Sequence, residues 1–220
     1  MLFRSGKIST INRKSSNIDL VTIADTQSEQ FIINKIKKNF PKHHIISEES
    51  NQEKIDSDYC WIIDPLDGTT NFIHGYPQFS VSIALEKDGR LEHAVIFDPL
   101  RDELFTASRG EGARLNDKRI RVSRIPHLDR ALLGTGFPFV AVNRIDPWLK
   151  TFRVLLLKAS GIRRSGSACL DLANIAAGRL DGFWEMSLQP WDMAAGVLLI
   201  REAGGLVSDF KGGQEFLSSG

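Results

Sequence analysis

The sequence predicts an α+β or layered α/β fold. Alternating apolar residues, typical of strands, fill the middle of the chain, and segments with helical apolar spacing lie on both sides of them. Because strands and helices come in mixed runs, layers of helices against mixed sheets are favoured. A length of 220 residues suits one large domain, so we expect a single domain over residues 1–220.

The composition indicates a soluble globular protein. Its hydrophobic content of 42% and charged content of 25% are ordinary for that class, and a net charge of +1 predicts neither a nucleic-acid nor a membrane partner. No apolar run approaches the roughly 20 residues of a membrane span. Cys60 and Cys169 have no zinc-type spacing, so we interpret them as reduced core thiols in a cytoplasmic protein.

The N-terminal part predicts one helix and one short strand. Thr26 and Glu29 form a capping-box pair at the start of an amphipathic helix that Pro41 ends. Asp25 is expected in the turn immediately before this helix. Residues 45–46 predict a short strand that runs into an acidic segment.

The strongest local signal lies in residues 61–72. An apolar run ends abruptly at Asp64, and the following proline biases Asp64 toward extended backbone, so the strand should persist to this residue. Asp67 and Gly68 signal a tight turn where glycine allows a close approach to a ligand, and Thr69 follows at once. Two carboxylates and a hydroxyl beside a glycine suit a metal and phosphate site.

The rest of the chain continues the mixture of strands and helices. An antiparallel meander is predicted over residues 79–107, and the glycines at 110 and 112 are interpreted as a hairpin turn, since no helical pattern follows them. The later predicted elements, in chain order, are a strand at 131–136, a helix at 143–160, a helix at 168–177 followed by Gly178, a short strand at 181–185, a helix at 193–203 with Asp192 as its N-cap, and a final strand at 206–210.

Four acidic residues from separate segments form a candidate metal cluster. Asp64 and Asp67 flank one turn, Glu48 ends the preceding strand, and Asp192 precedes a late helix. Each alone is explained as a turn, loop or cap residue. Together they offer the oxygen ligands that Mg²⁺ prefers, and two such ions about 3.5–4 Å apart can hold the attacking water and the leaving oxygen of a phosphoryl transfer.

Several motifs resemble the inositol monophosphatase family. They are SEES at 47–50, WIIDPLDGTTNF at 61–72, GSACLDLANIAAGRLDGFWE at 166–185 and PWDMAAG at 190–196. The bacterial inositol-1-monophosphatase branch is the closest resemblance, through GTGFPF at 134–139 and the pair Arg163-Arg164. The resemblance implies the sugar phosphatase fold, an αβαβα sandwich.

The resemblance also implies a set of metal ligands. Glu48, Asp64 and the carbonyl of Leu66 would hold one Mg²⁺, and Asp64, Asp67 and Asp192 would hold a second, with Asp64 bridging. A third, weaker Mg²⁺ near Glu48 is a further expectation of the family.

Catalytic and substrate-binding roles follow from the same resemblance. Thr69, oriented by Asp25, would polarise the attacking water together with Glu48 and the metal, and the backbone N–H groups of Gly68 and Thr69 would bind the phosphate. The positions that correspond to contacts with the inositol ring are Asp67, Ala168 and Glu185. Catalysis would then be positional and electrostatic, without a phosphoenzyme.

The implied function is Mg²⁺-dependent, lithium-sensitive hydrolysis of inositol 1-phosphate or a related small sugar phosphate by a cytoplasmic homodimer. Fructose 1,6-bisphosphate, adenosine 3′,5′-bisphosphate and histidinol phosphate are alternative substrates. A different class of function is partnership with transcription antitermination factors, without direct nucleic-acid binding. The sequence leaves open the physiological substrate, the number of bound metals and the oligomeric state, and Arg163-Arg164 is either a subunit contact or a plain surface pair.

Both ends of the chain depart from the family pattern. Residues 1–17 lack the amphipathic helix expected ahead of residues 21–25, and the chain stops before the strand and helix that family members add after residues 208–210. We therefore expect a domain that is short at both ends, with residues 1–17 loosely held. Exposed apolar faces at these ends would lower stability.

Overall fold

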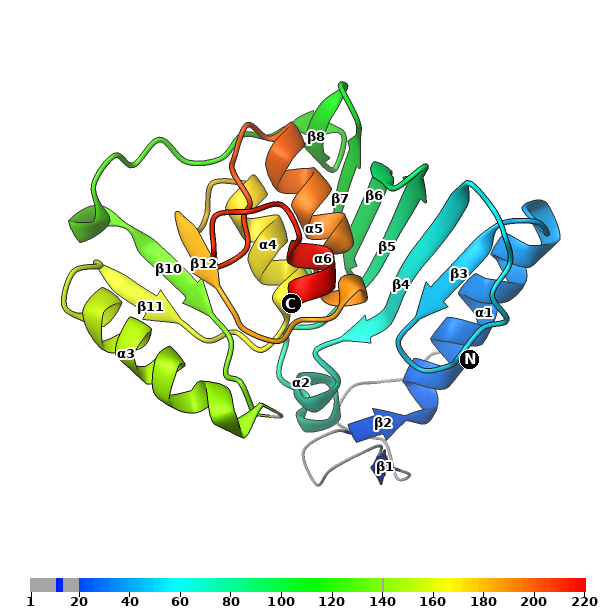
Figure 1. The fold of residues 1–220 in the computed structure, drawn as a ribbon, viewed down its shortest axis with the longest axis horizontal. Helices are drawn as coiled ribbons and strands as arrows, with labels where there is room; N and C mark the ends of the chain where they lie inside the picture. The colour runs from blue at the N-terminus through cyan, green and yellow to red at the C-terminus, as the bar shows by residue number, and fades with distance from the viewer. Residues whose placement is uncertain (1–10, 14–19, 140) are drawn as a thin grey trace.

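The computed structural model describes residues 11–13, 20–139 and 141–220. Figure 1 shows a layered molecule: an outer helix, a large sheet, a central pair of helices, a small sheet and a second outer helix. The predicted α+β class with mixed, largely antiparallel sheets is thus confirmed. None of the helices in the described part of the chain combines the length and the apolar character of a membrane span.

The large sheet carries the first half of the candidate site. Its seven strands, in spatial order, are β3 (His44–Ser47), β4 (Tyr59–Asp67), β5 (Ser80–Lys87), β6 (Arg90–Asp98), β7 (Glu103–Ser108), β8 (Gly112–Leu115) and β9 (Lys118–Arg119). β3 runs parallel to β4, and each later pair of neighbours is antiparallel. The predicted meander and the hairpin turn at Gly110 and Gly112 are confirmed.

Helices cover both faces of this sheet (Figure 1). On one face lies α1 (Ile23–Asn39), and on the other lie α4 (Ala168–Ala176) and α5 (Pro190–Glu202). The alternation of side chains along β4 divides the core accordingly, since Ile63 packs with α1 whereas Ile62 packs with α4 and α5.

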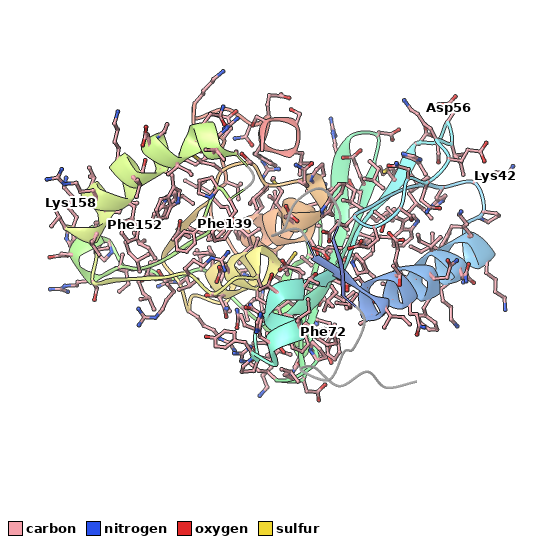
Figure 2. The ribbon with its side chains drawn as sticks, turned by 90° about the horizontal axis from the view of Figure 1, so that it is seen from below. Lys42, Asp56, Phe72, Phe139, Phe152 and Lys158 are labelled. Atoms are coloured by element: carbon pink, nitrogen blue, oxygen red, sulfur yellow. The ribbon has the colours of Figure 1, made fainter. Side chains whose placement is uncertain are left out.

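A small parallel sheet forms the next layer. It contains β11 (Gly161–Arg163), β10 (Leu132–Thr135) and β12 (Gly182–Trp184), and α3 (Ile145–Leu156) covers its outer side (Figure 1). Trp148 of α3 stacks on Phe152 and meets Phe137 edge-on. Figure 2 shows Phe139 and Phe152 on this side of the molecule, away from Lys42 and Asp56.

The remaining elements are short. They are the paired strands β1 (Ile11–Arg13) and β2 (Leu20–Thr22), the helices α2 (Thr69–His74) and α6 (Phe216–Ser219), and the 3₁₀ turns η1 (Leu128–Arg130) and η2 (Val142–Arg144). The prediction of a loosely held segment 1–17 falls largely outside the described residues, although β1 belongs to it.

Two predicted helix starts are wrong. α1 begins at Ile23 because Thr22 and Asp25 form the capping box: Thr22 accepts from the Ala24 N–H, and Asp25 accepts from the Thr22 N–H. α5 begins at Pro190 with Gln189 as its N-cap, so Asp192 lies in the first turn, where its carboxylate accepts from the Gln189 N–H at 2.6 Å. In both helices the N-cap residue lies earlier in the sequence than the predicted one: Thr22 instead of Thr26, and Gln189 instead of Asp192.

The predicted final strand at residues 206–210 is also wrong. This segment pairs with no strand of the described structure, and Leu206 is 98% exposed. Its apolar composition matched a strand, but strand formation requires a hydrogen-bonded neighbour, and the neighbouring edge strand β12 is paired only to β10.

The contact between α4 and α5 gives a test of the core. An added Cβ at Gly196 of α5 would lie 2.4 Å from the Cβ of Leu172 of α4. Gly196→Val should therefore push the helices apart and lower the free energy of unfolding by about 1–3 kcal/mol in a urea titration. Gln27→Val, at an exposed position of α1, is the control, with an expected loss below about 0.7 kcal/mol. Equal losses in the two variants would contradict this packing.

Candidate active site

A β-bulge at the end of β4 brings two carboxylates onto one face of the sheet. Asp64 pairs with Ser82 and Asp67 pairs with Ser80, so three residue steps on β4 match two on β5. Residues three apart on a regular strand point to opposite faces, and the extra residue of a bulge reverses this. Asp64 is 1% exposed, and its Oδ1 accepts from the Leu66 N–H at 3.0 Å.

The sequence-predicted metal ligands line one cavity of about 460 Å³. The site residues among its lining are Glu48, Asp64, Leu66, Asp67, Gly68, Thr69, Glu185 and Asp192. The donor set is rich in carboxylate and carbonyl oxygen, which suits Mg²⁺. Residues far apart in the sequence thus meet as the resemblance implied.

Ala168 lies in a smaller cavity of about 160 Å³ that shares Asp67, Glu185 and Asp192 with the larger one. Asp171 also lines it, and its Oδ1 has no hydrogen-bond partner in the described structure. Because a buried unpaired oxygen is costly, this cavity suits a ligand that donates hydrogen bonds, such as a polyol.

Arg164 lines both cavities, with its guanidinium 4.9 Å from the ring centre of Phe137. Arg164 is exposed, so its position agrees with a surface residue that also borders the two cavities. Arg163 is exposed at the end of β11.

Burial and mutual repulsion act on the carboxyl groups of the site. Burial, followed by the charges of Glu48, Asp67 and Asp192, raises the pKa of Asp64 well above its ordinary range. Burial also raises the pKa of Asp67 to about 6, although hydrogen bonds from Ser167 and Cys169 lower it. A cluster that resists its own ionisation in this way is stabilised by a bound cation, so the residues fit a divalent metal.

The carboxyls of the smaller cavity are shifted for the same reason. Burial raises the pKa of Glu185 to about 8, with further contributions from Asp192 and Asp67. Burial likewise raises the pKa of Asp171 to about 7, and the charge of Asp67 adds to this shift. Ionisation of Glu185 and Asp171 in the metal-free chain is therefore unfavourable.

Asp25 lies beneath the cavity and orients Thr69. The Thr69 hydroxyl donates to Asp25 Oδ1 at 2.8 Å and also lies 3.1 Å from the Leu66 carbonyl. The other oxygen of Asp25 accepts from the N–H and hydroxyl of Thr22 at 2.9 and 2.5 Å. With its proton directed at Asp25, the Thr69 oxygen can accept a hydrogen bond from a water in the cavity.

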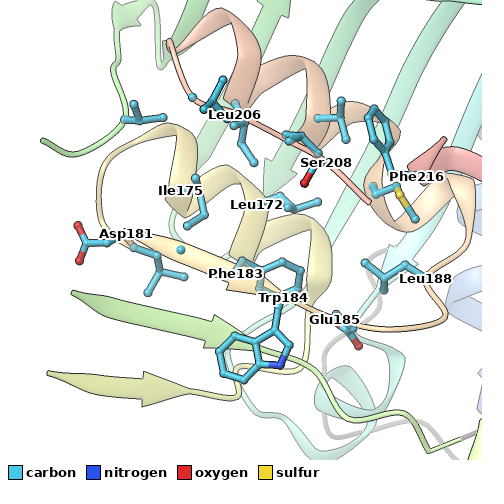
Figure 3. Close-up of a pocket in the computed structure, with 18 of the residues that line it drawn as sticks. Leu172, Ile175, Asp181, Phe183, Trp184, Glu185, Leu188, Leu206, Ser208 and Phe216 are labelled. Atoms are coloured by element: carbon cyan, nitrogen blue, oxygen red, sulfur yellow. The ribbon is translucent and has the colours of Figure 1, made fainter. Parts of the chain in front are cut away.

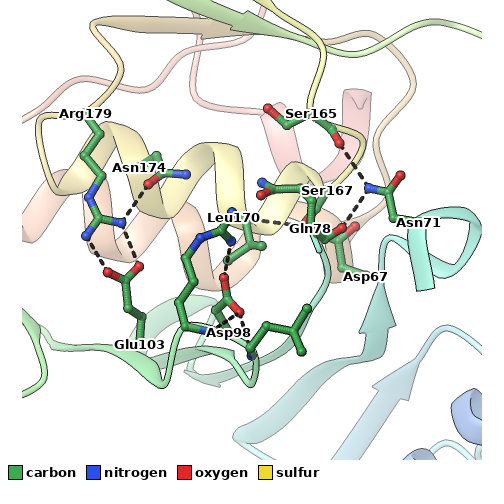
Figure 4. Close-up of polar contacts among 12 residues, drawn as sticks. Asp67, Asn71, Gln78, Asp98, Glu103, Ser165, Ser167, Leu170, Asn174 and Arg179 are labelled. Atoms are coloured by element: carbon green, nitrogen blue, oxygen red, sulfur yellow. Dashed lines mark hydrogen bonds and ion pairs between the residues drawn. The ribbon is translucent and has the colours of Figure 1, made fainter. Parts of the chain in front are cut away.

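Supporting residues around Asp67 were missed by the sequence reasoning. Ser167, the N-cap of α4, donates its hydroxyl to Asp67, and the Cys169 N–H donates to the same oxygen at 2.8 Å. Figure 4 shows Ser167 beside Asp67, with Asn71 bonded to Ser165. The N-cap preference of serine was the available signal, but it does not predict which carboxylate the helix end would meet.

Glu29 is the second missed support. Its carboxylate accepts from the Ser47 hydroxyl at 2.5 Å and from the N–H groups of Glu49 and Ser50 at 3.1 Å each. The loop that carries Glu48 is therefore anchored to α1 on both sides of Glu48. Glu29 was predicted as a cap residue, and its burial at 6% exposure was not foreseen.

A larger cavity of about 550 Å³ lies away from the carboxylate cluster. Figure 3 shows Leu172, Ile175 and Phe183 around it, with Leu206 and Phe216 on the opposite side and Glu185 at one end. Its lining is chiefly apolar, and the described residues around it include no close group of three metal-ligating side chains, so we do not assign the candidate active site to this cavity.

Fold and site together define a class: a layered α+β protein with a buried, oxygen-rich carboxylate cluster of the kind that holds divalent cations. Comparison with known families gives the next step. The model of the inositol monophosphatase family matches residues 3–220, and the chain belongs to this family.

Three similar proteins support this assignment. Nus factor SuhB of Pseudomonas aeruginosa is 53% identical, over 100% of this chain and 84% of its own length. The crystal structure of the extragenic suppressor protein suhB from Bartonella henselae is 48% identical, with a TM-score of 0.90 over 96% of this chain and 81% of that one. The Thermotoga maritima IMPase TM1415 is 37% identical, with a TM-score of 0.89 over 97% and 81%.

Two more distant structures were solved with ligands. An IMPase/NADP phosphatase complexed with Mg²⁺ and phosphate and a staphylococcal inositol monophosphatase in a LiCl-soaked inhibitory complex are each 26% identical, with TM-scores of 0.78 over 89% of this chain and 72% of theirs.

Asp64 and Asp98 form a matched pair for testing the site. Both begin an Asp-Pro-Leu turn, both are 1% exposed, and both accept from the N–H two residues later. Asp98 is ion-paired with Arg101 at 2.5 Å, whereas Asp64 faces Asp67. At about pH 8 without metal, Asp64→Asn should raise the free energy of unfolding and Asp98→Asn should lower it by about 1–3 kcal/mol.

With Mg²⁺ present, the wild-type chain should instead have a higher free energy of unfolding than Asp64→Asn. Wild-type chain should gain about 2.7 kcal/mol at a hundredfold excess over the dissociation constant, and Asp64→Asn should lose this gain. Urea titrations with EDTA and with Mg²⁺ measure both effects. An Mg²⁺ gain that survives in Asp64→Asn would remove Asp64 from the metal site.

The raised pKa values predict how metal binding depends on pH. Carboxyls whose folded-state pKa is raised stabilise the metal-free fold below about pH 4, and this contribution is lost as the pH rises through about 6 for Asp67, about 7 for Asp171 and about 8 for Glu185. Mg²⁺ needs the ionised forms of its ligands Asp64 and Asp67, so the rise in melting temperature on adding Mg²⁺ should grow as the pH rises through about 6, the pKa of Asp67. A pH-independent rise would contradict the assignment.

Proposed function

We propose that this chain is a Mg²⁺-dependent phosphomonoester hydrolase that acts on inositol 1-phosphate or a related small sugar phosphate. The observation that carries the proposal is the meeting of Glu48, Asp64, Asp67 and Asp192 with the Leu66 carbonyl in one cavity. Family membership and the related phosphatase complexed with Mg²⁺ and phosphate support it.

The proposed metal ligands divide into two overlapping sets. Glu48, Asp64 and the Leu66 carbonyl would hold one Mg²⁺, and Asp64, Asp67 and Asp192 a second, with room for a third near Glu48. When bound, the ions supply Lewis-acid polarisation of the phosphate and the water. The raised pKa of Asp64 supports its place between them, because this carboxyl feels the charges of the other three acids.

Thr69 and Asp25 would handle the proton of the attacking water. Since the Thr69 hydroxyl donates to Asp25 at 2.8 Å, its oxygen would accept a hydrogen bond from the attacking water and orient it toward phosphorus, and Thr69 would pass its own proton to Asp25 as it takes one from the water. The N–H groups of Gly68 and Thr69 would hold the phosphate oxygens. Gly68 has φ of +89°, and a Cβ there would lie 2.8 Å from the Gln78 carbonyl, so the turn requires glycine.

The smaller cavity would receive the alcohol part of the substrate. Asp67, Ala168 and Glu185 line it, and carboxylates there accept hydrogen bonds from ring hydroxyls. This arrangement favours a polyol phosphate over the nucleotide and histidinol phosphates, since an aromatic base would leave these carboxylates unpaired.

A second candidate function is partnership with transcription antitermination factors. It is favoured by the similarity to the Pseudomonas aeruginosa relative, which is a Nus factor and is 53% identical. We also propose, together with the hydrolase function, that the chain assembles as a homodimer and is cytoplasmic. α3 offers an apolar surface for assembly, with Leu149 49% and Val154 53% exposed. Lithium sensitivity is proposed by analogy with the staphylococcal complex.

A substrate panel tests the enzymatic proposal. Phosphate release should be greatest with inositol 1-phosphate or another polyol phosphate, should need Mg²⁺ and should fall with Li⁺. Thr69→Val, which keeps the shape but loses the hydroxyl, should lower kcat by about 10²–10⁴-fold with little change in KM. Thr70→Val, at the adjacent exposed threonine, is the control and should keep most activity.

The outcomes separate the two functions. Absence of turnover with every phosphate ester, together with retained binding of antitermination factors in a pull-down, would replace the enzymatic proposal by the binding role. Equal losses in Thr69→Val and Thr70→Val would remove Thr69 from the proton path.

A further inference from the structure

A sulfur atom lies against the carboxylates of the candidate active site. The Sγ of Cys169, one oxygen of Asp64 and one oxygen of Asp67 lie within 4.8 Å of one another. Cys169 is fully buried in the first turn of α4, and its N–H donates to Asp67 at 2.8 Å. The position of the sulfur beside the two acids is therefore fixed by the backbone.

This mixed set of ligands suits a different metal from Mg²⁺. Thiolate sulfur selects borderline and soft cations such as Zn²⁺, whereas Mg²⁺ prefers oxygen. Ligands on one tetrahedral Zn²⁺, at about 2.0–2.3 Å from the ion, lie about 3.3–3.8 Å apart. Three ligand atoms already within 4.8 Å of one another need to close by little to reach this geometry.

A buried hydroxyl without a partner lies at the same place. Ser80 and Ser82 stand opposite Asp67 and Asp64 in the β4–β5 ladder, and directly opposed side chains share a face of the sheet. The Ser80 side chain is fully buried, and its hydroxyl makes no hydrogen bond within the described structure. Since buried polar groups are normally paired, this hydroxyl points to a ligand, such as a water in the fourth position of an ion.

We propose that Asp64, Asp67 and Cys169 form a Zn²⁺ site that overlaps the magnesium centre, so that Zn²⁺ displaces Mg²⁺ and inhibits hydrolysis. The Zn²⁺ site rests on this geometry alone, whereas the inhibition rests on the proposed function. Two of the three ligands are shared with the magnesium centre, so the two metals exclude each other.

The chemistry of binding is an exchange of a proton for a metal ion. In the metal-free chain the Cys169 thiol lies 3.3 Å from the Asp192 carbonyl, to which it donates. On binding, the S–H bond breaks, a sulfur–zinc bond forms and the proton passes to solvent, with no change in oxidation state. Burial, followed by the charges of Asp67 and Asp64, raises the pKa of the metal-free Cys169 thiol well above its ordinary range, so the proton leaves only in exchange for the metal ion. Mg²⁺ binds sulfur weakly and leaves the thiol intact.

Cobalt spectroscopy of the full, metal-free chain tests the site. Co²⁺, used as the probe for Zn²⁺, should give a sulfur-to-cobalt charge-transfer band that Zn²⁺ abolishes by competition. Cys169→Ser should lose the band and weaken Zn²⁺ affinity by at least about 10-fold. Cys60→Ser is the matched control, because Cys60 is also a free cysteine but does not belong to the group formed by Asp64, Asp67 and Cys169, and it should keep the band and the Mg²⁺-dependent activity.

Each outcome decides one of the two proposals. Mg²⁺-dependent hydrolysis without a sulfur band in the wild type would overturn the Zn²⁺ site and leave the proposed function standing. A band without hydrolysis of any substrate would do the reverse. Loss of the band in Cys60→Ser instead of Cys169→Ser would also overturn the site. Should Cys169→Ser fail to fold, cadmium NMR of the wild-type chain decides, since its chemical shift reports whether sulfur is a ligand.

Discussion

The structure is organised around two carboxylates that repel each other. Asp64 and Asp67 are brought onto one face by the bulge in β4, and burial and repulsion raise the pKa of both. Three helices begin at this point: α2 at Thr69, α4 at Ala168 and α5 at Pro190, and residues at each start line the two cavities. Since the N-terminal end of a helix favours negative charge, this convergence offsets part of the repulsion. A bound divalent cation would relieve the rest of the repulsion between Asp64 and Asp67.

Two buried acidic residues of α1 hold the residues of the candidate site in place. Asp25 and Glu29 lie one turn apart on α1, 0% and 6% exposed. The first bonds Thr69, and the second bonds the loop on both sides of Glu48. A single helix thus fixes the hydroxyl at one side of the cavity and the carboxylate at the other. Because both carboxylates accept several hydrogen bonds, they fix the positions of the groups that donate to them.

The sequence predicted the meander, and it predicted the acidic residues that the fold brings into one cavity, for physical reasons. The strands 79–107 have a clean period of two, and the acidic residues stand in a specific motif whose partners the resemblance supplied. One feature that the sequence did not predict depends on residues far away along the chain. The bulge appears only when Asp64 and Asp67 are set against Ser82 and Ser80, and nothing local indicates it. Thr26 and Asp192 matched cap positions, yet the local capping boxes Thr22–Asp25 and Gln189–Asp192 begin both helices earlier. Strands and helices of three or four residues, such as β11 and α6, are too short to show a period.

The two Asp-Pro-Leu turns show why a motif alone does not define a site. At Asp98 the residue three positions on is Arg101, which neutralises the buried carboxylate, and the turn closes a hairpin between β6 and β7. At Asp64 the residue three positions on is Asp67, which is also acidic. The Leu66 N–H donates to Asp64 as the Leu100 N–H donates to Asp98. Among the described side chains that line the Asp64 cavity, Arg164 is the one cation. Local stability would favour an arginine at both places. Asp67 instead costs stability in the metal-free chain. This cost distinguishes the candidate binding site from the structural turn at Asp98.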